Sequence, residues 1–116
     1  MLTVNVLGYA LDSLGRAEKV TASNVSNDQT PGYTARTFNF RAALASAISS
    51  GGSATLTPSE GRSAAAAGTN GNNVNLSQQL VALSDEQLQT QAVSDALTSQ
   101  FQILSDSAAA SAGGTL

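Results

Sequence analysis

The chain of 116 residues contains no cysteine and no histidine, and only five of its residues are aromatic. The absence of cysteine excludes disulfides and thiolate metal ligands, and the absence of histidine removes the commonest general base and metal ligand. Charged residues make up 11% of the chain, and the formal net charge is −3. This acidic balance has the wrong sign for a nucleic-acid binder. The composition therefore leaves few chemical functions open.

Large apolar side chains are scarce as well. Hydrophobic residues account for 41% of the chain, but much of this fraction is alanine. Burial contributes about 25 cal/mol per Å² of apolar surface, and alanine offers little surface to bury. The length allows one domain at most. We therefore expect a thin core and a chain that completes its folding against neighbouring molecules.

Residues 4–25 are predicted to form an amphipathic helix because apolar side chains recur at helical spacing, and residues 1–30 form the first part of the predicted inner domain. The recurring apolar residues are Val4, Leu7, Leu11 and Leu14. Gly8 and Gly15 lie seven residues apart and share a face, so they are either simply tolerated or allow another helix to approach closely. The first residues lack a basic region and a long apolar run, which argues against a Sec signal peptide and a membrane span.

A turn and a short structured segment are predicted over residues 31–48. Pro31 stops the first helix, and Thr30-Pro31-Gly32-Tyr33 suits a type II turn, because Gly32 readily supplies the positive φ at the second central position. Thr37 to Phe40 is predicted to be extended, and Arg41 to Ile48 to form a short helix. Residues 49–73 have the Ser/Gly/Ala-rich composition of a flexible loop, in which residues 54–57 could pair as a strand.

Helical periodicity returns over residues 74–112. Asn75, with Gln78 three residues later, is similar to a capping box. The apolar residues that follow in a seam of 4-3 spacing are Leu76, Leu80, Leu83, Leu97, Phe101 and Leu104. Polar residues occupy the middle of this seam, so either the stripe drifts around the helix or the helix has several partners. We predict an all-α fold in which the two terminal helices pack as a coiled-coil inner domain.

No constellation of residues suggests catalysis. Asp85 and Glu86 are adjacent, so on a helix they point about 100° apart and cannot converge as an acid–base pair. The glycine-rich stretches lack the Gly-Lys-Ser/Thr ending of a phosphate loop, and the carboxylates are too dispersed for a metal loop. We therefore expect no enzyme activity, no cofactor, no metal and no small-molecule substrate.

Charge is distributed unevenly along the chain. Four of the five basic residues lie between Arg16 and Arg41, whereas Asp85, Glu86 and Asp106 belong to the acidic C-terminal third. The two parts could attract each other within a subunit or between subunits, or their charges could simply be solvated.

The most informative residues surround the predicted turn. They are Asn24, Asn27, Thr30, Pro31, Gly32, Tyr33, Arg36, Phe38 and Phe40. Their order resembles the Asn-x-x-Asn-x-x-Thr-Pro-Gly-Tyr signature of bacterial flagellar rod and hook axial proteins. Phe38-x-Phe40 and the run from Gly71 to Leu76 are similar to the proximal-rod members, the FlgB type. These residues form the predicted assembly site.

The resemblance implies a structural protein that self-assembles helically. It would form part of the proximal rod of the flagellar basal body, cross the periplasm and transmit torque for motility. The implied partners are further copies, other rod subunits, the membrane ring protein FliF, the adaptor FliE and the flagellar type III export apparatus. The alternatives are another rod subunit of the same superfamily, or a non-polymerising adaptor that binds partner helices.

Overall fold

The computed structural model describes residues 2–50 and 60–114 of the chain. Its elements are α1 (Leu2–Ser26), β1 (Arg36–Phe38), α2 (Phe40–Ser49), β2 (Glu60–Arg62) and α3 (Leu76–Gly114). The molecule is elongated, with extents of 74 × 25 × 14 Å. Two long terminal helices flank a short middle, so the prediction of a mostly helical chain is confirmed. None of the described helices combines the length and apolarity needed to cross a membrane.

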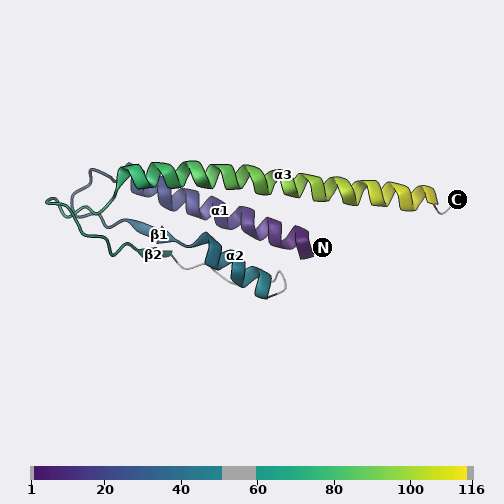
Figure 1. Ribbon diagram of the computed structural model, residues 1–116, viewed down its shortest axis with the longest axis horizontal. Helices are drawn as coiled ribbons and strands as arrows, with labels where there is room; N and C mark the ends of the chain where they lie inside the picture. The colour runs from purple at the N-terminus through teal and green to yellow at the C-terminus, as the bar shows by residue number, and fades with distance from the viewer. Residues whose placement is uncertain (1, 51–59, 115–116) are drawn as a thin grey trace.

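Helices α1 and α3 lie side by side and antiparallel (Figure 1). One face of α1 is buried, and its members recur every three or four residues: Tyr9, Ala10, Ser13, Leu14, Ala17, Val20, Thr21 and Asn24. Leu14 is the largest fully buried apolar side chain, and most of the others are small or polar. The core is therefore thin, as the composition predicts.

The face of α3 that packs on α1 is defined largely by polar contacts. Gln79 accepts a hydrogen bond from Asn24, and Thr90 donates one to Glu18. Of the predicted seam, Leu83 and Leu97 are half-buried, whereas Leu76, Leu80, Phe101 and Leu104 are exposed. The predicted seam therefore coincides with the packed face only in part, and that face combines apolar and polar side chains.

The helix ends depend on asparagine. Asn75 caps α3, since its Oδ1 accepts a hydrogen bond from the Gln78 backbone N–H at 3.1 Å, as predicted. Helix α1 ends at Ser26, within one residue of the end predicted for the first helix. There the Asn27 side chain donates to the Ser23 carbonyl at 2.8 Å, which supplies a partner for one of the helix's last carbonyls.

The middle of the chain packs alongside α1. Strands β1 and β2 pair antiparallel, with Phe38 opposite Glu60. The predicted short helix is confirmed as α2, in which Ala43 and Ala47 form a small buried cluster with Tyr9 of α1. Strand β2 was not predicted, and the proposed strand at residues 54–57 lies outside the described residues.

Two glycines meet where the turn follows α1. Gly32 has a φ of 73°, and the Tyr33 N–H donates to the Thr30 carbonyl at 3.3 Å, which confirms both features expected of the type II turn. Gly71 has a φ of 79°, and a Cβ added there would lie 3.2 Å from the Gly32 Cα. A Cβ at Gly71 would therefore be crowded by the turn, whereas a Cβ at Gly32 would meet nothing within 4 Å.

Gly71→Ala is expected to lower the free energy of unfolding by about 1–3 kcal/mol, because the left-handed conformation and the close approach to Gly32 both disfavour a Cβ. Urea denaturation followed by circular dichroism measures this change. Gly8→Ala is the matched control, since Gly8 lies within α1 with nothing near its added Cβ, and it should raise stability by up to about 1 kcal/mol. Equal midpoints for the two variants would contradict the prediction.

Candidate functional site

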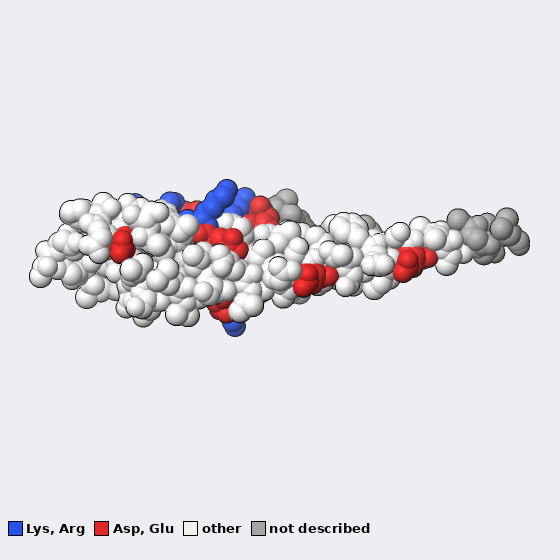
Figure 2. Space-filling model, turned by 90° about the horizontal axis from the view of Figure 1, so that it is seen from above, with Lys and Arg blue, Asp and Glu red and all other residues white. Residues whose placement is uncertain are grey.

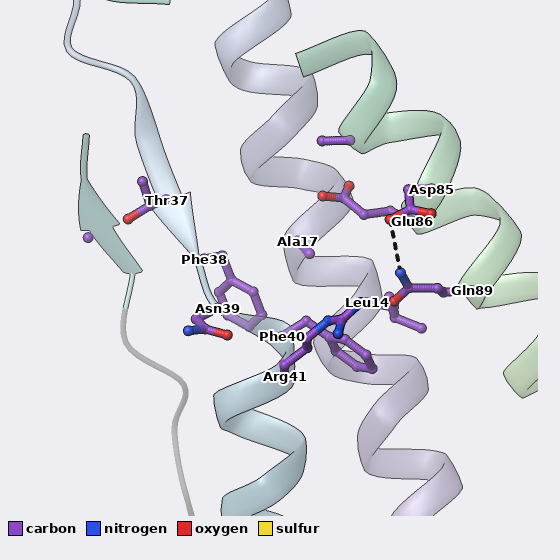
Figure 3. Close-up of a pocket in the computed structure, with 12 residues that line it drawn as sticks. Leu14, Ala17, Thr37, Phe38, Asn39, Phe40, Arg41, Asp85, Glu86 and Gln89 are labelled. Atoms are coloured by element: carbon purple, nitrogen blue, oxygen red, sulfur yellow. Dashed lines mark hydrogen bonds between the residues drawn. The ribbon is translucent and has the colours of Figure 1, made fainter. Parts of the chain in front are cut away.

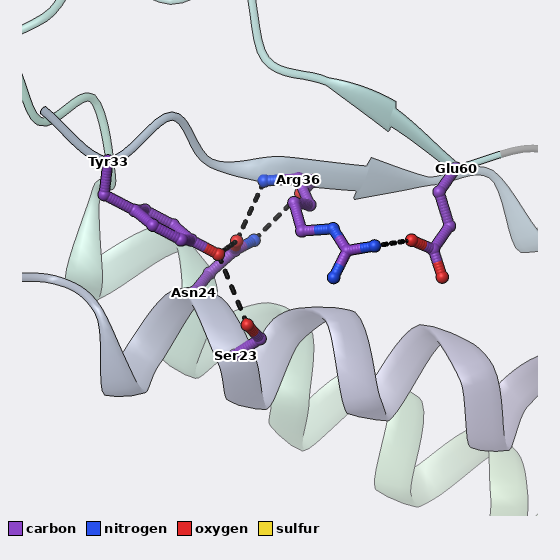
Figure 4. Close-up of polar contacts among 5 residues, drawn as sticks. All are labelled: Ser23, Asn24, Tyr33, Arg36 and Glu60. Atoms are coloured by element: carbon purple, nitrogen blue, oxygen red, sulfur yellow. Dashed lines mark hydrogen bonds and ion pairs between the residues drawn. The ribbon is translucent and has the colours of Figure 1, made fainter.

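Asn24 lies at the centre of the candidate site. It falls on the buried face of α1, and only 1% of its surface is exposed. Its Oδ1 accepts from the Arg36 N–H at 2.9 Å and from the Tyr33 hydroxyl at 3.1 Å (Figure 4). Its Nδ2 donates to the Arg36 carbonyl and to Gln79 Oε1, both at 2.9 Å. One side-chain amide thus uses both donors and both acceptor positions to join α1, the turn, β1 and α3.

Tyr33 and Arg36 extend this junction on either side of Asn24. The Tyr33 hydroxyl also lies 3.3 Å from Ser23 Oγ, so the ring is held over the last turns of α1. The Arg36 side chain forms an ion pair with Glu60, which links β1 to β2 (Figure 4). The same residue therefore binds α1 through its backbone and the neighbouring strand through its side chain.

Asn72 supports the turn from the other side. Its Nδ2 donates to the Asn27 carbonyl at 2.7 Å and to the Thr30 carbonyl at 2.8 Å. The Thr30 hydroxyl in turn donates to Asn27 Oδ1 at 3.0 Å. The two carbonyls belong to the turn that follows α1, where they also accept from the Thr30 and Tyr33 N–H groups. The segment before α3 thereby holds the chain as it leaves α1.

Asn73 makes an equivalent set of contacts with the strand region. Its Oδ1 accepts from the Ala35 N–H at 2.6 Å, and its Nδ2 donates to the carbonyls of Ser63 and Ala65. The backbone adds a bond from the Gly32 N–H to the Asn70 carbonyl at 2.8 Å. The predicted flexible loop, residues 49–73, therefore includes a hydrogen-bonded segment that sequence reasoning missed. The available signal was the asparagine-rich run directly before α3.

The structure brings most of the predicted assembly residues together, but not all of them. Asn24, Asn27, Thr30, Gly32, Tyr33 and Arg36 meet in the junction, while Pro31 lies exposed on the turn. Phe38 and Phe40 instead line a separate depression of about 630 Å³ (Figure 3). Sequence reasoning did not identify Asn72, Asn73 or Gln79 as members of the junction.

The depression lies between β1, the start of α2, α1 and α3. Leu14 contributes to its lining from α1, and Asp85 and Glu86 contribute from α3 (Figure 3). The Glu86 Oε1 accepts from the Thr21 hydroxyl at 2.8 Å, whereas Oε2 is buried without a hydrogen-bond partner among the described residues. The wall that faces the two aromatic rings is therefore acidic.

Burial raises the pKa of Glu86 above its ordinary value of 4.5. The bond from Thr21 lowers that pKa, while the nearby charges of Glu18 and Asp85 raise it further. The ion pairs among the described residues do not include Glu86, and Arg41 is the basic residue that lines the same depression. The ionised form of Glu86 is therefore less favourable in the folded chain than in the unfolded chain.

The basic and acidic parts of the chain do not pair with each other in the described residues. The ion pairs there are Arg16 with Asp12 and Arg36 with Glu60. Figure 2 shows the basic side chains gathered over the middle of the molecule, whereas the visible face of the long projecting end carries only acidic ones. Of the alternatives for this charge distribution, attraction within the subunit has no support in these contacts.

The junction is held together by side-chain and backbone hydrogen bonds and by one ion pair. The described residues contain no group of three His, Cys, Asp or Glu side chains that could hold a metal ion. No family model matches the chain, and no curated protein matches it. What the site can do follows from its geometry, which holds the end of α1, the turn and the start of α3 in one arrangement.

Asn24→Ala is expected to lower the free energy of unfolding by about 2 kcal/mol or more, because it leaves partners on three segments without their hydrogen bonds. Urea denaturation measures the loss, and hydrogen exchange should show the Arg36 amide losing protection. Asn5→Ala, an exposed asparagine on the same helix, is the control and should change stability little. If both variants unfolded at the same urea concentration, the central role of Asn24 would be wrong.

Glu86→Gln is expected to stabilise the chain at pH 7 and to have little effect near pH 3. Because the pKa of Glu86 is raised on folding, the folded chain binds more protons between the ordinary and the raised value. Its stability therefore falls as pH rises through that window and stays lower above it. Glutamine removes this loss while its Oε1 can still accept from Thr21.

Thermal unfolding at pH 3, 5 and 7 measures how the stability difference between the Glu86→Gln variant and the unmodified chain depends on pH. Asp106→Asn removes one negative charge from an exposed position of α3 and serves as the control. A Glu86→Gln variant that gained the same stability at every pH would show that the burial of the charge is not the cause.

Proposed function

We propose that this chain is a structural subunit of the bacterial flagellar rod, of the proximal-rod type. In this proposal the chain polymerises helically in the basal body, spans the periplasm with its neighbours and transmits torque between the membrane ring and the distal rod and hook. The antiparallel helices α1 and α3 form its coiled-coil inner domain. It performs no catalysis and needs no cofactor.

The observation that carries the proposal is the structure of the Asn24 junction. The residues that resemble the axial-protein signature are Asn24, Asn27, Thr30, Gly32 and Tyr33, and each has a definite role there. Asn24 joins four segments, Thr30 and Asn27 complete the end of α1, and Gly32 takes the positive φ of the turn. A motif that fixes how α1, the turn, β1 and α3 connect, without a candidate catalytic group among its residues, suits a structural protein.

The exposed apolar surface supports self-assembly. Large hydrophobic side chains lie uncovered along α2 and α3: Ile48, Leu76, Leu80, Val81, Leu88, Phe101, Ile103 and Leu104. Large apolar areas on a small chain mark surfaces that other molecules cover. Together with the thin core, they favour a subunit that gains much of its stability from its neighbours.

The partners follow from the same proposal. Further copies and other rod subunits would cover the helix faces, while FliF and FliE would contact the base of the rod. Export would proceed through the flagellar type III apparatus.

A cysteine introduced at Thr34, beside the turn, distinguishes a polymerising subunit from a non-polymerising adaptor when cells are treated with a cross-linker. A ladder of self-adducts supports the rod, and a single adduct with another protein supports an adaptor.

Gly32→Val is expected to abolish rod assembly and motility while leaving export nearly unchanged. A β-branched residue resists the φ of 73° at this turn, so the chain cannot leave α1 in the required direction. The test replaces the chromosomal copy and measures swimming, secreted protein and the protein content of purified basal bodies. Ala64→Val, which adds the same side chain at an exposed position, should behave like the unmodified chain.

Normal rods in the Gly32→Val strain would overturn the mechanical role of the turn. Absence of the unmodified chain from purified basal bodies would overturn the proposed function as a whole.

A further inference from the structure

The loop before α3 contains two neighbouring residues that can react with each other. Asn70 is followed by Gly71, and no other asparagine of the chain precedes a glycine. The side-chain amide carbon of an asparagine lies near the backbone nitrogen of the next residue, and a glycine leaves that nitrogen open because it carries no side chain. The pair lies between β2 and α3, at the end of the molecule opposite to the C-terminal end of α3 (Figure 1). It is therefore suited to cyclisation.

The reaction open to this pair is deamidation through a cyclic imide. The Gly71 nitrogen forms a bond to Asn70 Cγ, the bond from Cγ to Nδ2 breaks, and ammonia leaves with the proton that the Gly71 nitrogen gives up. Water then opens the imide at one of its two carbonyl carbons. Cleavage at Cγ yields aspartate with the original main chain. Cleavage at the main-chain carbonyl carbon yields isoaspartate, in which the main chain runs through the former side chain.

The folded loop restrains both reacting groups. The Gly71 N–H donates to the Gly68 carbonyl at 2.9 Å, and the Gly68 N–H donates to the Asn72 carbonyl at 2.9 Å. The Asn70 Oδ1 accepts from the Asn72 N–H at 3.1 Å. The attacking nitrogen must lose its proton, and an acceptor on its N–H favours the protonated form. Cyclisation therefore requires that the loop opens first.

The loop is in turn tied to the turn that follows α1. The Gly32 N–H donates to the Asn70 carbonyl at 2.8 Å, and Gly71, with a φ of 79°, lies close to Gly32. Asn72 is buried and donates to two carbonyls of the same turn. Asn70 itself is exposed, so water can reach its side chain. What holds the pair back is thus the closed junction and not a lack of water.

We propose that the pair Asn70 and Gly71 is a self-modification site that the closed junction suppresses, so that deamidation marks chains whose junction has opened. A segment that opens locally exposes its reactive groups in proportion to the population of the open form. The rate of deamidation therefore follows the opening of the joint between α1, the turn and α3. The chemistry takes place within one chain, so it is independent of the proposed function.

The two products affect the junction differently. Aspartate keeps the original main chain and an oxygen that can accept from the Asn72 N–H. Isoaspartate adds a carbon to the main chain and displaces the Asn70 carbonyl, which accepts from the Gly32 N–H. The longer chain also moves Gly71 out of its close fit against Gly32. Isoaspartate is therefore the product that disrupts the joint.

Peptide mapping by mass spectrometry tests the site and its suppression. The purified full chain is incubated at mildly alkaline pH with and without denaturing guanidinium chloride, and the loss of ammonia at Asn70 is followed over time. We expect deamidation to be at least about tenfold faster in the denatured chain than in the folded chain. Equal rates would overturn the suppression, and an intact Asn70 in the denatured chain would overturn the site.

A substitution that opens the junction without changing the reactive pair gives a second readout. Asn24→Ala should accelerate deamidation at Asn70 in the absence of denaturant and leave the rate in guanidinium chloride unchanged. Asn5→Ala, at an exposed position of the same helix, is the matched control and should react as slowly as the unmodified chain. The coupling to the junction would be wrong if the two variants reacted at the same rate without denaturant.

The products can be compared directly. Asn70→Asp reproduces one of them and should unfold at nearly the same denaturant concentration as the unmodified chain, whereas the isoaspartate form, separated by chromatography, should unfold at a lower one. Identical midpoints for these two forms would show that the added main-chain carbon does not disrupt the joint.

Discussion

The fold depends on one buried side-chain amide. An amide removed from water costs free energy unless its donors and acceptors find partners, and Asn24 finds four. Because those partners belong to the turn, to β1 and to α3, a displacement of any one of these segments leaves Asn24 incompletely bonded. The junction therefore orders three connections at once, which a core composed mainly of alanine and other small side chains could not do by apolar contact alone.

The same reliance on polar contacts continues along the helix pair. Thr21 with Glu86 and Glu18 with Thr90 join α1 to α3 at positions where many helix pairs carry leucine. Burial of the Glu86 carboxylate in this arrangement raises its pKa, and the ion pairs among the described residues do not include it. Polar pairs hold the two helices in register, while several large apolar side chains of α3 remain uncovered and available to neighbours.

The proposed structural role rests on this combination of a hydrogen-bonded joint and exposed apolar surface. Hydrogen bonds within the chain define the joint, and apolar surface outside it offers the means of association. Under the proposed function, the junction then directs each subunit and the helix surfaces join it to the next.

Local interactions made much of this structure predictable from the sequence alone. Helical spacing, the type II turn at Gly32 and the Asn75 cap each depend on residues within one or two helical turns of one another, and all three occur as expected. The tertiary structure alone decided which face of α3 meets α1, and it gave Asn72 and Asn73 their place. The hydrogen-bond partners of Asn72 and Asn73 lie far away in the chain. Gln79, the partner of Asn24, lies 55 residues from it. A run of asparagines has no periodicity that identifies such distant partners, because only the tertiary fold brings those segments close to it.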